Sequence, residues 1–208
     1  MGGSKGVPGA RRAGCRADRV TIRPVTRRPI FLDRDGVINV DLDPYVTSAD
    51  DFRLFPWTVD ALETLDRAGY DIYVVSNQQG VALGLYTEDT LREIDAKLQA
   101  AVAPRGFQIR RIYYCTLLRS EAGDYRKPGP GMVFQARDEF GLDLSGAFLI
   151  GDQPTDIECA HRAGLRPILV LSGVSRAGDW HEWPYQPERV FPNLLEAAEW
   201  IARGQVTS

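Results

Sequence analysis

The stretch that decides the fold of this 208-residue chain reads PIFLDRDGVI and spans residues 29–38. Its apolar start, Ile30 to Leu32, is typical of a strand that is buried on both faces. The strand ends in two carboxylates, Asp33 and Asp35. Because open α/β sheets bind ligands at the carboxyl ends of their strands, this position favours a functional site over a simple polar turn.

Outward from this stretch, short β-favouring runs alternate with helical patterns, which predicts an α/β fold. We expect a Rossmann-like three-layer sandwich with a central parallel sheet. The expected strands cover residues 29–33, 71–75, 111–115, 147–150 and 167–171. The expected helices cover residues 57–68, 130–140, 156–163 and 194–202, with one more that Thr87 opens as its N-cap.

The composition, 44% hydrophobic and 25% charged, is ordinary for a globular protein. No window approaches 18 uninterrupted apolar residues, so we expect no membrane span. The three cysteines are too few and too widely spaced for a disulfide framework, which favours a cytoplasmic setting.

The net charge of −3 is unevenly distributed along the chain. Residues 1–28 hold eight basic side chains and one acid, while the rest holds 17 basic and 27 acidic residues. We therefore expect a basic, disordered extension over 1–28 and a catalytic domain over 29–208. An acidic body argues against nucleic acid as a partner.

Polar residues follow several of the expected strands. Ser76 and Asn77 could hold phosphoryl oxygens, and the cations Arg126 and Lys127 could neutralise charge on a transferring phosphoryl group. Two further carboxylates, Asp152 and Asp156, follow the strand over 147–150. Each motif alone also fits a turn, a helix cap or a solvated surface. Together they predict a phosphoryl-transfer site with Mg²⁺, which prefers hard oxygen ligands.

As a set, these motifs resemble the four motifs of the haloacid dehalogenase (HAD) superfamily: Asp-x-Asp-x-Val, Ser/Thr, Lys, and Gly-Asp-x-x-x-Asp. The resemblance covers residues 29–172 and implies a HAD-like fold. The 43 residues from Asp33 to Ser76 and the 51 from Ser76 to Lys127 leave no room for a cap domain. We therefore expect a capless member.

The resemblance also implies a role for each motif residue. Asp33 would be the nucleophile that forms an aspartyl-phosphate, and Asp35 the general acid and base. Mg²⁺ would be held by the Asp33 carboxylate, the Asp35 carbonyl and Asp152. Phosphate or substrate contacts would come from Ser76, Asn77, Arg126 and Lys127, and Asp156 would orient Lys127.

Within the superfamily, the chain most resembles the D-glycero-D-manno-heptose 1,7-bisphosphate phosphatases. The stretches that carry this resemblance are residues 33–41, 45–46, 77–82 and 126–132. The implied substrate is a small phosphorylated metabolite, a heptose 1,7-bisphosphate that loses its 7-phosphate, and we expect a monomer. Histidinol phosphate or another small phosphomonoester is an alternative. A non-catalytic phospho-ligand binding protein and a polynucleotide 3′-phosphatase are rivals.

The chain departs from this family at two places. Leu83 stands where the family usually has arginine. The family's zinc-binding loop, Cys-x-His followed by Cys-x-Cys, retains one ligand of four here, Cys115. We therefore expect no structural zinc, with Cys115 as a small buried residue. Burial of Leu117 and Leu118 could anchor the loop in place of the metal.

Overall fold

The structure is a computed structural model that describes residues 1–2, 27–42 and 45–204. Most of the expected basic extension, residues 3–26, lies outside the described residues. Arg28 is the first residue of the sheet, and Arg27 pairs with Asp66 and Asp71 at 2.5 and 2.7 Å. The folded body therefore includes the last two residues of the segment that we assigned to the extension.

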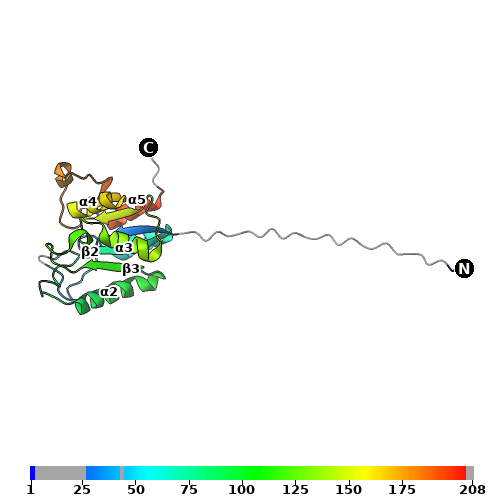
Figure 1. Ribbon diagram of the computed structural model, residues 1–208, viewed down its shortest axis with the longest axis horizontal. Coiled ribbons are helices and arrows are strands. Elements are labelled where there is room, and N and C mark those ends of the chain that lie inside the picture. The colour runs from blue at the N-terminus through cyan, green and yellow to red at the C-terminus, as the bar shows by residue number, and fades with distance from the viewer. Residues whose placement is uncertain (3–26, 43–44, 205–208) are drawn as a thin grey trace.

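Among the described residues, six parallel strands form one central sheet in the order β3-β2-β1-β4-β5-β6 (Figure 1). Their bounds are Arg28–Leu32 for β1, Tyr70–Asn77 for β2, Arg111–Cys115 for β3, Phe148–Gly151 for β4, Arg166–Val170 for β5 and Arg189–Phe191 for β6. The predicted parallel sheet is confirmed. Only β6, three residues at the edge, was not expected, because so short and partly exposed a run has no clear period.

In the part of the chain that the structure describes, five α-helices connect the strands and cover both faces of the sheet. They are α1 (Thr58–Arg67), α2 (Glu88–Val102), α3 (Gly131–Phe140), α4 (Pro154–Ala163) and α5 (Leu194–Ala202). Short 3₁₀ helices also lie in the connections: η1 (Ala103–Arg105), η2 (Gly123–Tyr125) and η3 (Asp179–Glu182). No separate cap domain interrupts β1 to β3 in the described residues, as the spacing predicted.

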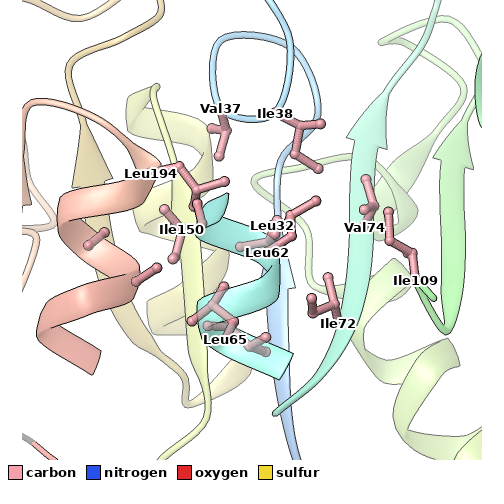
Figure 2. Packing of buried hydrophobic residues seen from close by; sticks show 14 of the residues in the cluster. Leu32, Val37, Ile38, Leu62, Leu65, Ile72, Val74, Ile109, Ile150 and Leu194 are labelled. Atoms are coloured by element: carbon pink, nitrogen blue, oxygen red, sulfur yellow. The ribbon is translucent and has the colours of Figure 1, made fainter. Parts of the chain in front are cut away.

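The alternation of side chains along β1 divides the core into two layers. Ile30 and Leu32 face the larger layer, which α1, α2 and α5 close, whereas Phe31 faces the layer under α3 and α4. Figure 2 shows Leu62 and Leu65 of α1 packed over the strands of the larger layer. The molecule is therefore the three-layer sandwich that the alternating pattern predicted.

Each helix near the site begins at a recognisable signal. Thr87 caps α2 by accepting a hydrogen bond from the backbone N–H of Thr90. At α4, Pro154 occupies the first turn and Gln153 is the N-cap, so the helix begins two residues before the expected Asp156.

No helix in the described part of the chain is long and apolar enough to cross a membrane.

Candidate active site

The expected site residues lie at the carboxyl ends of three neighbouring strands. Asp33 follows β1, Ser76 lies near the end of β2, and Asp152 follows β4. Because the sheet order places β1 between β2 and β4, these residues meet at one edge of the sheet. A pocket of about 270 Å³ opens there. It is lined by Asp33, Asp35, Asp41, Tyr45, Val46, Ser76, Asn77, Gln78, Arg119, Arg126, Lys127, Gln153 and Thr155.

Lys127 is buried between two carboxylates. Its Nζ lies 2.8 Å from Oδ1 of Asp33 and 2.6 Å from Oδ1 of Asp156. Burial alone would lower the pKa of Lys127, but the charges of Asp156 and Asp33 outweigh it and raise that pKa above its ordinary value. The ammonium is therefore a fixed positive charge beside Asp33, and it also forms an ion pair with Asp156.

Asp152 is fully buried, and only one of its two carboxylate oxygens has a hydrogen-bond partner in the described residues. Its Oδ2 accepts a hydrogen bond from the backbone N–H of Val174 at 2.7 Å. Its buried Oδ1 has no hydrogen-bond partner in the described residues. Burial, followed by the negative charges of Asp156 and Asp33, raises the pKa of Asp152 to about 8. Burial also raises the pKa of Asp33 to about 7, although Lys127 opposes the shift.

These carboxylates fit a hard divalent cation. One oxygen each of Asp33, Asp152 and Asp156 lies within 4.8 Å of the others. Buried carboxylates with raised pKa values are poorly compensated without a cation, and a carboxylate oxygen is a ligand that Mg²⁺ favours. Asp33 and Asp156 both pair with Lys127, so the unpartnered Oδ1 of Asp152 is the best candidate among them for a cation ligand.

Two glycines make room for Asp152. A Cβ on Gly173 would lie 2.0 Å from Oδ2 of Asp152, and one on Gly36 would lie 2.5 Å from the same atom. Gly36 also has a φ of +79°, which disfavours other residues. The backbone of the loop after β5 can therefore approach Asp152 closely enough to donate the hydrogen bond from Val174.

The second carboxylate of the first motif, Asp35, is held by three side chains. Arg34, Asn39 and Gln78 all donate hydrogen bonds to its oxygens. Asp35 lines the pocket together with Asp33. The structure therefore places both motif carboxylates at the site and gives them different surroundings.

Ser76 and Asn77 both reach the site, but with different surroundings. Ser76 is buried, and its Oγ accepts a hydrogen bond from Nε2 of Gln78 at 2.9 Å. The amide of Asn77 donates to the carbonyl of Lys127 and accepts from its backbone N–H, both at 3.0 Å. The Asn77 side chain thus fixes the Lys127 backbone, a role that the sequence did not suggest.

Several pocket residues were missed by the sequence analysis. Gln78 is fully buried and links Asp35 to Ser76, while Tyr45, Arg119, Gln153 and Thr155 line the pocket. The Asn-Gln-Gln-Gly stretch was noted for its resemblance and not for a contact. An amide that follows a strand end beside a candidate serine was the signal that could have found Gln78.

The loop before Lys127 differs from expectation. Cys115 is buried, as predicted, but Leu117 is 46% exposed and Leu118 only partly buried, so these leucines do not anchor the loop. Ala122 enters the layer that holds Cys115, and the Tyr125 hydroxyl donates to Gln135 of α3 at 2.6 Å. The loop turns back at η2, which brings Ala122 to the core in place of the leucines.

Comparison with known proteins assigns the family. The model of a family described as HAD-hydrolase-like matches residues 124–197. The D-glycero-beta-D-manno-heptose-1,7-bisphosphate 7-phosphatase of Pseudomonas aeruginosa is 38% identical over 149 residues, which are 72% of this chain and 84% of that protein. The chain belongs to this phosphatase family. The corresponding enzyme of Chlorobaculum tepidum is 36% identical over 191 residues, covering 86% and 96% of the two chains.

Solved structures of the family agree with the fold. The D,D-heptose 1,7-bisphosphate phosphatase from B. bronchiseptica, complexed with magnesium and phosphate, has a TM-score of 0.79 and 33% identity. The alignment covers 85% of this chain and 98% of that one. The enzyme from Burkholderia thailandensis has a TM-score of 0.62 and 27% identity, covering 83% and 97%. The chain is therefore a HAD-like phosphatase with the small, capless fold of this family.

Proposed function

We propose that this chain removes the 7-phosphate of D-glycero-D-manno-heptose 1,7-bisphosphate through an aspartyl-phosphate at Asp33. The observation that carries the proposal is the pairing of Asp33 with the buried Lys127 inside a pocket beside Asp152. A carboxylate next to a fixed cation is suited to attack an anionic phosphoryl group. The substrate rests on the relatives' printed names and on the cations that line the pocket.

In the first step, an oxygen of Asp33 attacks phosphorus and the bond from phosphorus to the sugar oxygen breaks. Asp35 gives a proton to the departing sugar oxygen. Lys127 and Ser76 bind the phosphoryl oxygens. Magnesium, held by the carboxylates of Asp33 and Asp152 and by the carbonyl of Asp35, would neutralise charge on the phosphoryl group when bound.

In the second step, water attacks phosphorus of the aspartyl-phosphate and the Asp33 carboxylate leaves. Asp35, now ionised, takes a proton from that water, and the products are inorganic phosphate and the free enzyme. Both steps use the same phosphoryl contacts. The same residues therefore serve two in-line displacements at one phosphorus.

Two further cations, Arg126 and Arg119, line the pocket. Arg126 is half-buried, and its Nη1 has no hydrogen-bond partner among the described residues. A guanidinium with free donors suits a remote phosphate, which would account for a bisphosphate substrate.

The substrate proposal is tested with a bisphosphate and the matching 7-monophosphate. The wild type should have the higher kcat/KM on the bisphosphate, and Arg126→Ala should remove that preference. Arg111→Ala is the matched control, because Arg111 is exposed at the amino end of β3, whereas the pocket lies at the carboxyl ends of the strands. Equal kcat/KM values for the two sugars in the wild type would refute recognition of the second phosphate.

The rival functions are separated in the same assay. Histidinol phosphate and a DNA 3′-phosphate are added to the panel, with magnesium present throughout. The proposal expects the heptose bisphosphate to be hydrolysed far better than either. Tight phosphate-ester binding without any turnover would instead support a binding protein.

A further inference from the structure

Arg34, between the two motif carboxylates, is an unusual residue for its position. It is only 1% exposed and ranks among the largest fully buried side chains of the molecule. A buried guanidinium is strongly unfavourable unless a carboxylate compensates it. Its ion-pair partner among the described residues is Asp35, at 2.8 Å.

The contact between Arg34 and Asp35 fixes both oxygens of the carboxylate. Nη2 of Arg34 donates to Oδ2 at 2.8 Å and to Oδ1 at 2.9 Å, and Nε lies 3.2 Å from Oδ1. Gln78 adds a donor to Oδ2 at 2.7 Å, and Asn39 adds one to Oδ1 at 2.9 Å. Rotation of the carboxylate would break several of these bonds, so its plane is set by the donors around it.

The donors are themselves held in place. The Arg34 guanidinium lies 5.6 Å from the centroid of the Tyr114 ring and 6.0 Å from that of Phe52. Tyr114 in turn donates from its hydroxyl to Asp95 of α2. The guanidinium thus lies near two rings, one of which is tied to a helix.

Gln78 is anchored in the same way on the other side of the carboxylate. Its Oε1 accepts from the Tyr86 hydroxyl at 2.6 Å, and its Nε2 donates to both Asp35 and Ser76. Three hydrogen bonds to other side chains therefore fix the orientation of the Gln78 amide. The orientation of Asp35 is linked through Gln78 to the serine that is proposed to contact phosphate.

We propose that Arg34 is a positioning residue that fixes the orientation of Asp35, whose protonated carboxyl group gives its proton to the leaving oxygen and becomes the carboxylate. The inference rests on the proposed function, in which Asp35 is the general acid. Proton transfer needs the donor within hydrogen-bond reach of the leaving oxygen, and a small displacement of that donor slows the reaction strongly. The guanidinium is planar, and its Nε and Nη2 donors together hold both oxygens in a geometry that an ammonium on a flexible stem does not reproduce.

The test is Arg34→Lys, assayed on a sugar phosphate and on 4-nitrophenyl phosphate. The parameter kcat/KM covers the steps up to departure of the leaving group. A sugar oxygen must be protonated as it leaves, whereas 4-nitrophenolate is stable without a proton. Arg34→Lys should therefore lower kcat/KM about 10-fold to 10²-fold more on the sugar phosphate than on the aryl phosphate.

Asp35→Asn is the positive control and should show the same dependence on the leaving group. If Arg34 only compensated buried charge, Arg34→Lys would lower both kcat/KM values by the same factor, which would overturn the inference. Circular dichroism and a thermal melt check that the variant folds.

Should Arg34→Lys not fold, Arg34→Gln carries the test, because it also removes the guanidinium that contacts both Asp35 oxygens. The difference between the two substrates then reports on the orientation of Asp35. Equal effects on both esters would again overturn the inference. A wild type that hydrolyses neither ester would instead show that the proposed function has failed, and the inference with it.

Discussion

At the residue scale, the site is a group of buried charges that balance only in part. Two carboxylates, Asp33 and Asp156, pair with one ammonium, Lys127, and a third, Asp152, lies close to both carboxylates. Burial of like charges is unfavourable, and the raised pKa values of Asp33 and Asp152 express that cost. The site is therefore prepared for a divalent cation and for an anionic substrate.

Asp33→Asn should abolish turnover and leave the fold intact, because an amide cannot attack phosphorus to form the mixed anhydride. Asp35→Asn should lower kcat by about 10²-fold or more, as loss of a general acid and base does. Steady-state assays on a sugar phosphate measure both changes. Substantial turnover by Asp33→Asn would rule out the covalent route.

The raised pKa values also predict how the metal-free protein responds to pH. Folding raises the pKa of Asp33 from 3.8 to about 7 and that of Asp152 to about 8, so the folded state binds more protons than the unfolded chain between pH 4 and 8. These two groups therefore make the protein less stable as pH rises through that range. In EDTA, the melting temperature should be higher at pH 6 than at pH 8.

Magnesium should reverse this trend, since it competes with protons for the same oxygens. It should raise the melting temperature more at pH 8 than at pH 6. Asp152→Asn should weaken both the pH dependence of the melting temperature in EDTA and its increase with magnesium. Thermal melts of the wild type and of Asp152→Asn at pH 6 and pH 8 measure these changes. A magnesium effect that is equal at both pH values would contradict the assignment of Asp152 as a ligand.

At the element scale, the ends of the strands could be predicted because a polar functional residue follows directly after an apolar run. Asp33 follows the run that forms β1, Asp152 follows the run that forms β4, and both strands lie where expected. Parallel strands then bring these ends to one edge. The arrangement of the motif residues thus followed from local pattern and sheet geometry.

Contacts within the loops could not be predicted in this way. The burial of Ala122 in place of Leu117 depends on where the chain turns at η2, and no period in the sequence encodes that turn. The hydrogen bond from the Asn77 amide to the Lys127 carbonyl joins residues that are 50 positions apart in the sequence. Contacts of this kind depend on the assembled fold and not on a neighbouring residue.

The loop after β5 is an element whose shape can be tested. Gly173→Ala would place a Cβ 2.0 Å from Asp152 Oδ2, so either the loop or the carboxylate must move. The magnesium concentration for half-maximal activity should rise by about 10-fold or more, as loss of support around metal ligands does. A magnesium titration of the activity measures this. An unchanged requirement would show that the loop does not position Asp152.

At the scale of the whole molecule, all of the proposed chemistry lies at one edge of a sheet that helices cover on both faces (Figure 1). In the described residues, loops together with the end of β2 and the first turn of α4 line the pocket, and no separate domain does. Substrate selection is then expected to depend on loop residues such as Tyr45, Arg119 and Arg126. The residue at Leu83, half exposed where the family usually has arginine, is another position at which this chain differs.

The altered loop predicts that the folded molecule needs no structural zinc. Cys115 is buried in an apolar layer beside Ala122, and the chain's two histidines lie far away in sequence. Elemental analysis of the purified protein should find far less than one zinc per chain, and a zinc chelator should not lower the melting temperature. Stoichiometric zinc with Cys115 as a ligand would contradict this prediction.

The most direct measurement is chemical trapping of the intermediate. The enzyme is mixed with substrate and magnesium, quenched during turnover and reduced with borohydride, which converts an aspartyl-phosphate to homoserine. Mass spectrometry of the peptide that spans Asp33 and Asp35 then locates the change, and Asp152 serves as an internal control. The proposed mechanism predicts homoserine at position 33 and nowhere else. Homoserine at another aspartate, or continued turnover with none formed and full activity in Asp33→Asn, would contradict it.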